Sequence, residues 1–283
     1  MPSLPRLVDR TADRPRTIVT IAGGNVRFGD GGFHTIGGPC AIEDEPQLEA
    51  AARGVRAAGG AMLRGGAYKP RTSPYDFQGL GDEGVALIAA VGRRHGLPTV
   101  VEGLAESQMP VLGAHVDMIQ IGARNMQNVP LLRAAAATGL PILLKRGPSG
   151  LLDELLSAAE YVVLAGNPHV VLCERGIRSF DPETRNVLDL GGALRLKELT
   201  HLPVIVDPSH ASGRRSLVEP LVLAAAAAGL DGAIVEVHPA PVTARCDASQ
   251  QIEPADFARV VRKARAIRSA LAAVEAERDL VIA

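Results

Sequence analysis

Tryptophan is absent from this 283-residue sequence, which contains only five phenylalanines and three tyrosines. Proteins that bind single-stranded RNA stack its bases on aromatic side chains, so this class is not expected. An excess of either charge is also lacking, because 30 Lys and Arg residues nearly balance 31 Asp and Glu residues. This balance argues against general nucleic-acid binding and against a membrane-surface protein.

Cysteine and long apolar runs are scarce as well. Three cysteines in a chain of this length do not form a disulfide framework, which favours a reducing, cytoplasmic setting. The longest wholly apolar stretch, 221–230, has about half the length that a membrane-spanning helix needs. The first 16 residues contain no apolar segment typical of a secretory signal, so none is expected.

The remaining sequence alternates between short apolar runs and Ala- and Leu-rich stretches. The apolar runs predict strands at 34–38, 61–63, 98–101, 118–121, 141–144, 170–173, 203–206 and 233–237. The other stretches predict helices at 46–58, 80–95, 105–114, 129–138, 151–165, 214–228 and 254–276, with a mixed segment at 181–199. Eight strands, each followed by a helix, indicate an α/β fold and specifically a (β/α)₈ TIM barrel.

The N-terminal region differs from this alternation. Residues 17–38 contain two extended pieces, RTIVTIA and FHTIGG, with the turn signals of a hairpin at 23–32. We expect this short β-hairpin to cover the N-terminal face of the barrel. The predicted division is a lead with a hairpin at 1–33 and a catalytic barrel at 34–283.

Ionisable side chains follow all eight predicted strands. They are Cys40, Arg64, Glu102, Arg124, Lys145, Glu174 with Arg175, Asp207 with His210, and Glu236. The carboxyl ends of barrel strands meet at one mouth, where the active sites of such barrels lie. The sequence therefore predicts an active site at this mouth.

Six of the residues expected there are cations. Four belong to the strand ends and two come from the KPRTS segment; they are Arg64, Lys69, Arg71, Arg124, Lys145 and Arg175. Cations crowded together repel one another unless an anion is bound between them. Arg and Lys bind phosphate and carboxylate oxygens, so the set suits more than one anionic group.

A second subset contains Cys40, His210, Glu236 and Asp247. Strands eight and one are neighbours in a closed barrel, so these four residues can meet on one side of the mouth. Their S, N and O donors suit a divalent metal such as Mn, Fe, Co or Zn. Taken singly, Cys40 also fits a small buried apolar residue, and His210 fits a hydrogen-bonded loop residue.

Several motifs carry a family resemblance over about residues 20–255. They are GGPCAIE, LRGGAYKPRTSPYDFQGLG, DMIQIGARNMQN, PILLKRG, CERGIRSFDPETRN, PVIVDPSHASGRR and IVEVHPAP. With these motifs the chain resembles the 3-deoxy-D-arabino-heptulosonate-7-phosphate (DAHP) synthases, most closely their short type I-beta branch. The segment Lys69-Pro70-Arg71-Thr72 replaces the asparagine-containing motif of KDO-8-phosphate synthases, which favours a four-carbon sugar.

The resemblance implies a transferase that condenses phosphoenolpyruvate with erythrose 4-phosphate in the shikimate pathway. It implies Cys40, His210, Glu236 and Asp247 as ligands of one divalent metal, with manganese first and Fe, Co or Zn as alternatives. The implied phosphoenolpyruvate-binding residues are Arg64, Ala123, Arg124, Lys145 and Arg175. The residues implied for erythrose 4-phosphate are Lys69, Pro70, Arg71 and Thr72. Catalytic roles are implied for Lys69, Glu102, Asp207 and His210, and either Lys69 or Glu102 moves the protons.

The resemblance also implies a homodimer or homotetramer. No regulatory domain is visible, so we expect no inhibition by Phe, Tyr or Trp unless a regulatory partner protein supplies it. Neither nucleic acid nor a membrane is an expected partner. Two alternatives stay open: a paralogue using another aldose phosphate, as KDO-8-phosphate synthases do, and a non-catalytic barrel that acts as a scaffold.

Two segments depart from the family pattern, GLAES at 103–107 and RCDASQQ at 245–251. The second has lost a glycine beside Asp247 and gained Cys246. One hypothesis is a Cys40–Cys246 disulfide that forms when the metal is lost. The alternative is that Cys246 simply replaces a serine, because a disulfide needs specific Cα spacing.

Overall fold

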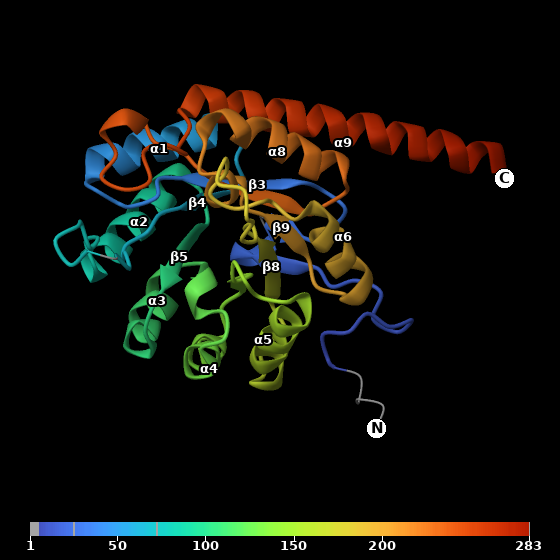
Figure 1. The fold of residues 1–283 in the computed structure, drawn as a ribbon, viewed down its shortest axis with the longest axis horizontal. Helices are drawn as coiled ribbons and strands as arrows, with labels where there is room; N and C mark the ends of the chain where they lie inside the picture. Colours follow the sequence, from blue (N-terminus) through green and yellow to red (C-terminus); the bar gives the residue numbers. More distant parts are fainter. Residues whose placement is uncertain (1–5, 25, 72, 283) are drawn as a thin grey trace.

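A closed barrel of eight parallel strands forms the centre of the molecule (Figure 1). The computed structural model describes residues 6–24, 26–71 and 73–282. The barrel strands, in order, are β3 (His34–Gly38), β4 (Met62–Arg64), β5 (Thr99–Gly103), β6 (Met118–Ile121), β7 (Ile142–Lys145), β8 (Val170–Glu174), β9 (Val204–Val206) and β10 (Gly232–Glu236). β10 pairs in parallel with β3 and closes the barrel. The predicted (β/α)₈ fold is confirmed.

Helices surround the barrel. The longer ones are α1 (Glu45–Ala57), α2 (Asp82–His95), α3 (Met109–His115), α4 (Val129–Ala137), α5 (Leu152–Leu164), α6 (Leu190–Leu199), α8 (Arg215–Ala227) and α9 (Pro254–Ile282). Figure 1 shows α9 beside α8, with its C-terminal end extending past the barrel. Among the described residues, no helix combines the length and apolar character needed to cross a bilayer.

Local chemistry sets several helix ends. Asp44 caps α1, because its side chain accepts a hydrogen bond from the backbone N–H of Gln47 at 2.7 Å. Gly96 ends α2 in the left-handed conformation, with φ of 60°, which glycine adopts without a steric penalty.

The structure corrects one helix prediction, refines a second and adds a helix that was not predicted. The helix predicted at 105–114 is divided into a 3₁₀ turn, η2 (Glu106–Gln108), and α3, whose first turn contains Pro110. The mixed segment at 181–199 is helical only from Leu190, after the capping residue Asp189. The five-residue helix α7 (Pro208–Ser212) was not predicted, because it is too short to show a periodic pattern.

A separate two-stranded sheet precedes the barrel. β1 (Val19–Ile21) pairs antiparallel with β2 (Val26–Phe28). The prediction that 34–38 supplies an extended piece of this hairpin was wrong, because that segment pairs with β10 and β4. Glycines on both sides of Val26–Phe28 hid this strand among turn signals.

The hairpin closes one end of the barrel interior. Its inward side chains pack against a layer of apolar residues from all eight barrel strands, and Cys173 of β8 adjoins this layer. The hairpin residues are Val19, Ile21, Val26 and Phe28; the layer consists of Ile36, Met62, Val100, Met118, Leu143, Val171, Ile205 and Ile234. Since these strand residues come before the polar strand ends, the hairpin covers the N-terminal face, as predicted.

Candidate functional site

The candidate site is the next layer of the same barrel interior. Side chains two positions apart on a strand point to the same face, so each strand presents a second inward residue toward the mouth. These residues are Gly38, Arg64, Glu102, Gln120, Lys145, Cys173, Asp207 and Glu236. The apolar layer is therefore followed, two residues further along each strand, by a mainly polar layer.

Four potential metal ligands lie together on one side of this layer. One donor atom from each of Cys40, His210, Glu236 and Asp247 falls within 4.8 Å of the others. Cys40 and Glu236 are fully buried or nearly so, and His210 and Asp247 are partly exposed. A thiol, an imidazole and two carboxylates form a donor set that fits a divalent transition metal.

His210 is oriented by the start of α7. Asp207 caps this short helix by accepting a hydrogen bond from the backbone N–H of His210 at 3.0 Å. The other oxygen of Asp207, Oδ2, lies 2.7 Å from His210 Nδ1. The second ring nitrogen, Nε2, then faces Glu236 Oε1 at 3.3 Å and Asp247 Oδ2 at 3.7 Å.

Buried cations hold the carboxylates of this layer. Arg64 Nη1 donates to Glu236 Oε1 at 2.6 Å, and Lys145 Nζ donates to Asp207 Oδ2 at 2.5 Å. Burial alone would raise the pKa of Glu236, but the charges of His210, Arg64 and Lys69 outweigh it and lower that pKa to about 2. Burial would also raise the pKa of Asp207, but His210 and Lys145 outweigh it and hold that pKa well below the usual range.

A cavity of about 620 Å³ opens beside the four ligands. Ten of the predicted site residues line it: Lys69, Pro70, Arg71, Glu102, Ala123, Arg124, Lys145, Arg175, His210 and Asp247. Thr72 lies outside the described residues. The cavity wall also contains eight residues that were not predicted as site residues: Asp76, Gln120, Gly122, Pro148, Arg178, Arg185, Asn186 and Cys246.

Five strand-end residues do not line this cavity: Cys40, Arg64, Glu174, Asp207 and Glu236. Cys40 and Glu236 belong to the donor cluster, and Asp207 contacts it through His210. Arg64 is not among the residues that line the cavity; it lies buried against Glu236. Glu174 follows the inward Cys173, so it points out of the barrel interior, where Arg146 Nη1 contacts its Oε2 at 2.9 Å. The prediction that every strand end places its charged side chain at the mouth was therefore wrong for Glu174.

The two thiols of the site are adjacent. Cys40 Sγ lies 3.1 Å from Cys246 Sγ, and all three cysteines of the chain are free thiols. Lys69 Nζ lies 3.1 Å from Cys40 Sγ, and Arg71 Nη1 lies 2.9 Å from Cys246 Sγ. The hydrogen bond from Cys40 and the charge of Lys69 lower the pKa of Cys246 to about 7.

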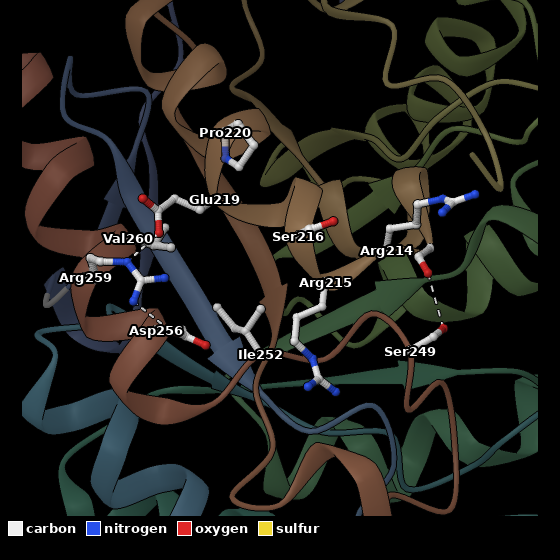
Figure 2. Close-up of a pocket in the computed structure, with 11 residues that line it drawn as sticks. Arg214, Arg215, Ser216, Glu219, Pro220, Ser249, Ile252, Asp256, Arg259 and Val260 are labelled. Atoms are coloured by element: carbon white, nitrogen blue, oxygen red, sulfur yellow. Dashed lines mark hydrogen bonds and ion pairs between the residues drawn. The ribbon is translucent and has the colours of Figure 1, made fainter. Parts of the chain in front are cut away.

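A second cavity, of about 720 Å³, lies between the first turns of α8 and α9 (Figure 2). Three of its charged side chains pair with one another: Arg259 contacts Glu219 and Asp256, both at 2.7 Å. This cavity lacks the inward-pointing layer and the donor cluster, so the barrel mouth is the stronger candidate site.

Comparisons with known proteins show which family the sequence matches. The sequence model of the DAHP synthetase I family matches residues 13–271. The phospho-2-dehydro-3-deoxyheptonate aldolase of Thermotoga maritima is 43% identical over 266 residues, which cover 94% of this chain and 78% of the relative. The 2-dehydro-3-deoxyphosphooctonate aldolase of Rhodopseudomonas palustris is 30% identical over 261 residues, 86% of this chain and 90% of the relative.

Two solved structures of the same family also match this chain. The structure of the Thermotoga maritima aldolase has a TM-score of 0.90 at 43% identity and covers 94% of this chain and 77% of its own. A truncated form of the 3-deoxy-D-arabino-heptulosonate 7-phosphate synthase of the same organism has a TM-score of 0.87 at 40% identity, covering 94% of this chain and 97% of its own.

Proposed function

The chain belongs to the DAHP synthetase I family, and from this premise we infer that it is a DAHP synthase. In the inferred reaction phosphoenolpyruvate and erythrose 4-phosphate combine with water to give DAHP and phosphate. The observation that carries the inference is the position of the four-donor cluster at the edge of a cavity rich in cations.

The cations suit the charged groups of phosphoenolpyruvate. Lys145 ends β7, Arg175 follows the neighbouring β8, and Arg124 follows β6 on the other side of β7; all three line the cavity. We assign these three residues, with the backbone of Ala123, to the phosphate and carboxylate, whose charge they stabilise as phosphate leaves. Arg64 contributes to the same site by holding Glu236.

The segment after β4 suits the aldose phosphate. Lys69, Pro70 and Arg71 line the cavity beside the thiols, and Arg124 Nη1 donates to the carbonyl of Pro70 at 3.1 Å. This contact ties the aldose segment to the phosphoenolpyruvate side. When bound by Cys40, His210, Glu236 and Asp247, a divalent metal supplies Lewis-acid polarisation of the aldehyde.

Glu102 is the better candidate for moving protons. It lines the cavity, and Gln120 Nε2 donates to its Oε2 at 3.0 Å. Lys69 instead donates to the carbonyl and to the sulfur of Cys40, and nearby thiol and carboxylate charges outweigh burial and raise its pKa. An ammonium held in this way orients groups and is a poor proton acceptor at neutral pH.

Finer assignments follow from the donor set and the family. Manganese is our first choice of metal, and Fe, Co and Zn are the alternatives. A homodimer or homotetramer is supported by family membership, and a cytoplasmic setting by the three free thiols. We assign catalysis to residues 34–283 and closure of the barrel to the hairpin within 1–33.

A substrate comparison tests the function. Phosphate release from phosphoenolpyruvate is measured with metal-loaded protein and either erythrose 4-phosphate or arabinose 5-phosphate. We expect release only with the four-carbon sugar and its loss with EDTA. Release with arabinose 5-phosphate would instead favour the activity named for the 30%-identical relative. Release with neither sugar would favour a different aldose or a non-catalytic barrel.

A further inference from the structure

Gln250 lies between two of the candidate metal ligands and has no role in the function described above. Its side-chain Nε2 donates to Glu236 Oε2 at 2.6 Å and lies 3.4 Å from Asp247 Oδ2. The residue is 1% exposed. A buried amide therefore contacts both carboxylates of the donor cluster at once.

The surroundings determine which end of this amide faces the carboxylates. Arg185 Nη1 donates to Gln250 Oε1 at 3.3 Å from the other side. If the amide were rotated by half a turn, its oxygen would face two carboxylates and its NH₂ group would face a guanidinium. Both contacts would then be unfavourable, so Arg185 and the two carboxylates fix one orientation.

The contact completes the hydrogen bonding of Glu236. Its Oε1 accepts from Arg64 at 2.6 Å, and Gln250 supplies the donor for Oε2. With a donor on each oxygen, the plane of the carboxylate is fixed before any metal binds. Such support around metal ligands raises metal affinity, because the ligands need little rearrangement.

Asp247 needs support for a different reason. Its backbone has φ of 50°, in the left-handed region that few residues other than glycine adopt. Gln250, three residues later, contacts both the side-chain oxygen and the backbone carbonyl of Asp247, the latter through its own N–H at 3.3 Å.

We propose that Gln250 is a positioning residue of the metal centre, which holds Glu236 and Asp247 in the arrangement that binds the metal. A neutral donor suits this role: it bridges two carboxylates without cancelling the charge that attracts the metal. The proposal rests on the proposed function, because it assumes that the four-donor cluster binds a metal.

Cobalt binding tests the proposal. Metal-free protein is titrated with Co²⁺, and the thiolate-to-cobalt absorption band contributed by Cys40 is followed. Gln250→Met keeps the length of the side chain and removes the donor, and we expect its Kd for Co²⁺ to rise by about 10–100-fold. The band should still appear at saturating Co²⁺, and turnover should recover there.

Asn167→Leu is the matched control. Asn167 is another buried amide, 2% exposed, but it lies before β8 at the opposite end of the barrel. Its Nδ2 donates to the carbonyl of Leu140 at 2.8 Å. This variant should lower the melting temperature and leave the Kd for Co²⁺ unchanged.

The outcomes distinguish failure of the metal centre from failure of the role proposed for Gln250. A wild-type protein without a thiolate band would contradict the metal centre itself. A wild-type band combined with a Kd in folded Gln250→Met that matches wild type would overturn the role of Gln250. If Gln250→Met does not fold, Gln250→Asn shortens the same amide by one methylene and must also weaken Co²⁺ binding.

Discussion

Nδ1 of His210 lies 2.7 Å from Oδ2 of Asp207, and the same oxygen lies 2.5 Å from Nζ of Lys145. Asp207 thus joins a candidate metal ligand to a candidate phosphoenolpyruvate-binding cation. A carboxylate that accepts from one ring nitrogen fixes the tautomer and leaves the other nitrogen free to bind a metal. One side chain therefore orients groups on both halves of the site.

Asp207→Asn tests this arrangement. The amide cannot accept from His210 and Lys145 with the strength of a carboxylate, so we expect Co²⁺ affinity to fall by about 10–100-fold. The KM for phosphoenolpyruvate should also rise, because Lys145 loses its partner. Asp181→Asn, in an exposed loop, is the control. Unchanged affinity and KM in Asp207→Asn would show that Asp207 orients neither group.

Glu102→Gln tests the proton transfer. Loss of a positioned acid or base costs about 10²–10⁴-fold in rate, so kcat should fall on that scale while KM changes little. Glu106→Gln, on the neighbouring turn, should leave both constants unchanged. If instead Lys69→Met abolishes turnover and Glu102→Gln retains it, the proton moves through Lys69.

Oxidation of the two adjacent thiols is a further prediction. In metal-free protein, hydrogen peroxide should convert Cys40 and Cys246 to a disulfide; the thiols lose two hydrogens and the peroxide becomes two water molecules. Bound metal should protect Cys40. Peptide mapping by mass spectrometry reads out the bond, and Cys246→Ser is the control. Finding only free thiols at both positions after oxidation would refute the hypothesis.

Glu219→Gln tests the pairing of α8 with α9 beside the second cavity (Figure 2). A hydrogen bond from Lys263, with Arg259 nearby, lowers the pKa of Glu219 below its usual 4.5. A lowered acid pKa stabilises the folded state above about pH 4.5 and loses that effect as the pH falls.

We therefore expect Glu219→Gln to melt about 1 °C below wild type at pH 7, since exposed pairs contribute little. The difference should vanish in acid. Thermal melts across pH measure it, and Glu253→Gln controls for removal of a carboxylate near the start of α9. A difference that grows as the pH falls would contradict the assigned sign.

The sequence was sufficient to predict the barrel and most of the cavity lining, because apolar strand patterns and strand-end charges are local signals. The alternation of side chains along a strand is also visible in the sequence. It would have shown that Lys145 and Gln120 point into the barrel and that Glu174 points out of it. The pairing of Arg64 with Glu236 was not accessible in this way. It joins residues 172 positions apart and depends on how side chains of the closed barrel meet.

The hairpin that closes the barrel has a consequence for the order of folding. Val19 and Phe28 precede every barrel strand in the chain, yet the surface that buries them includes Ile234 of β10. Their apolar side chains must stay exposed, or be covered by something else, until β10 has been synthesised. Pairing this distant in sequence closes slowly. The hairpin is therefore buried only when the barrel is complete, and a probe placed on it would detect the final folding step.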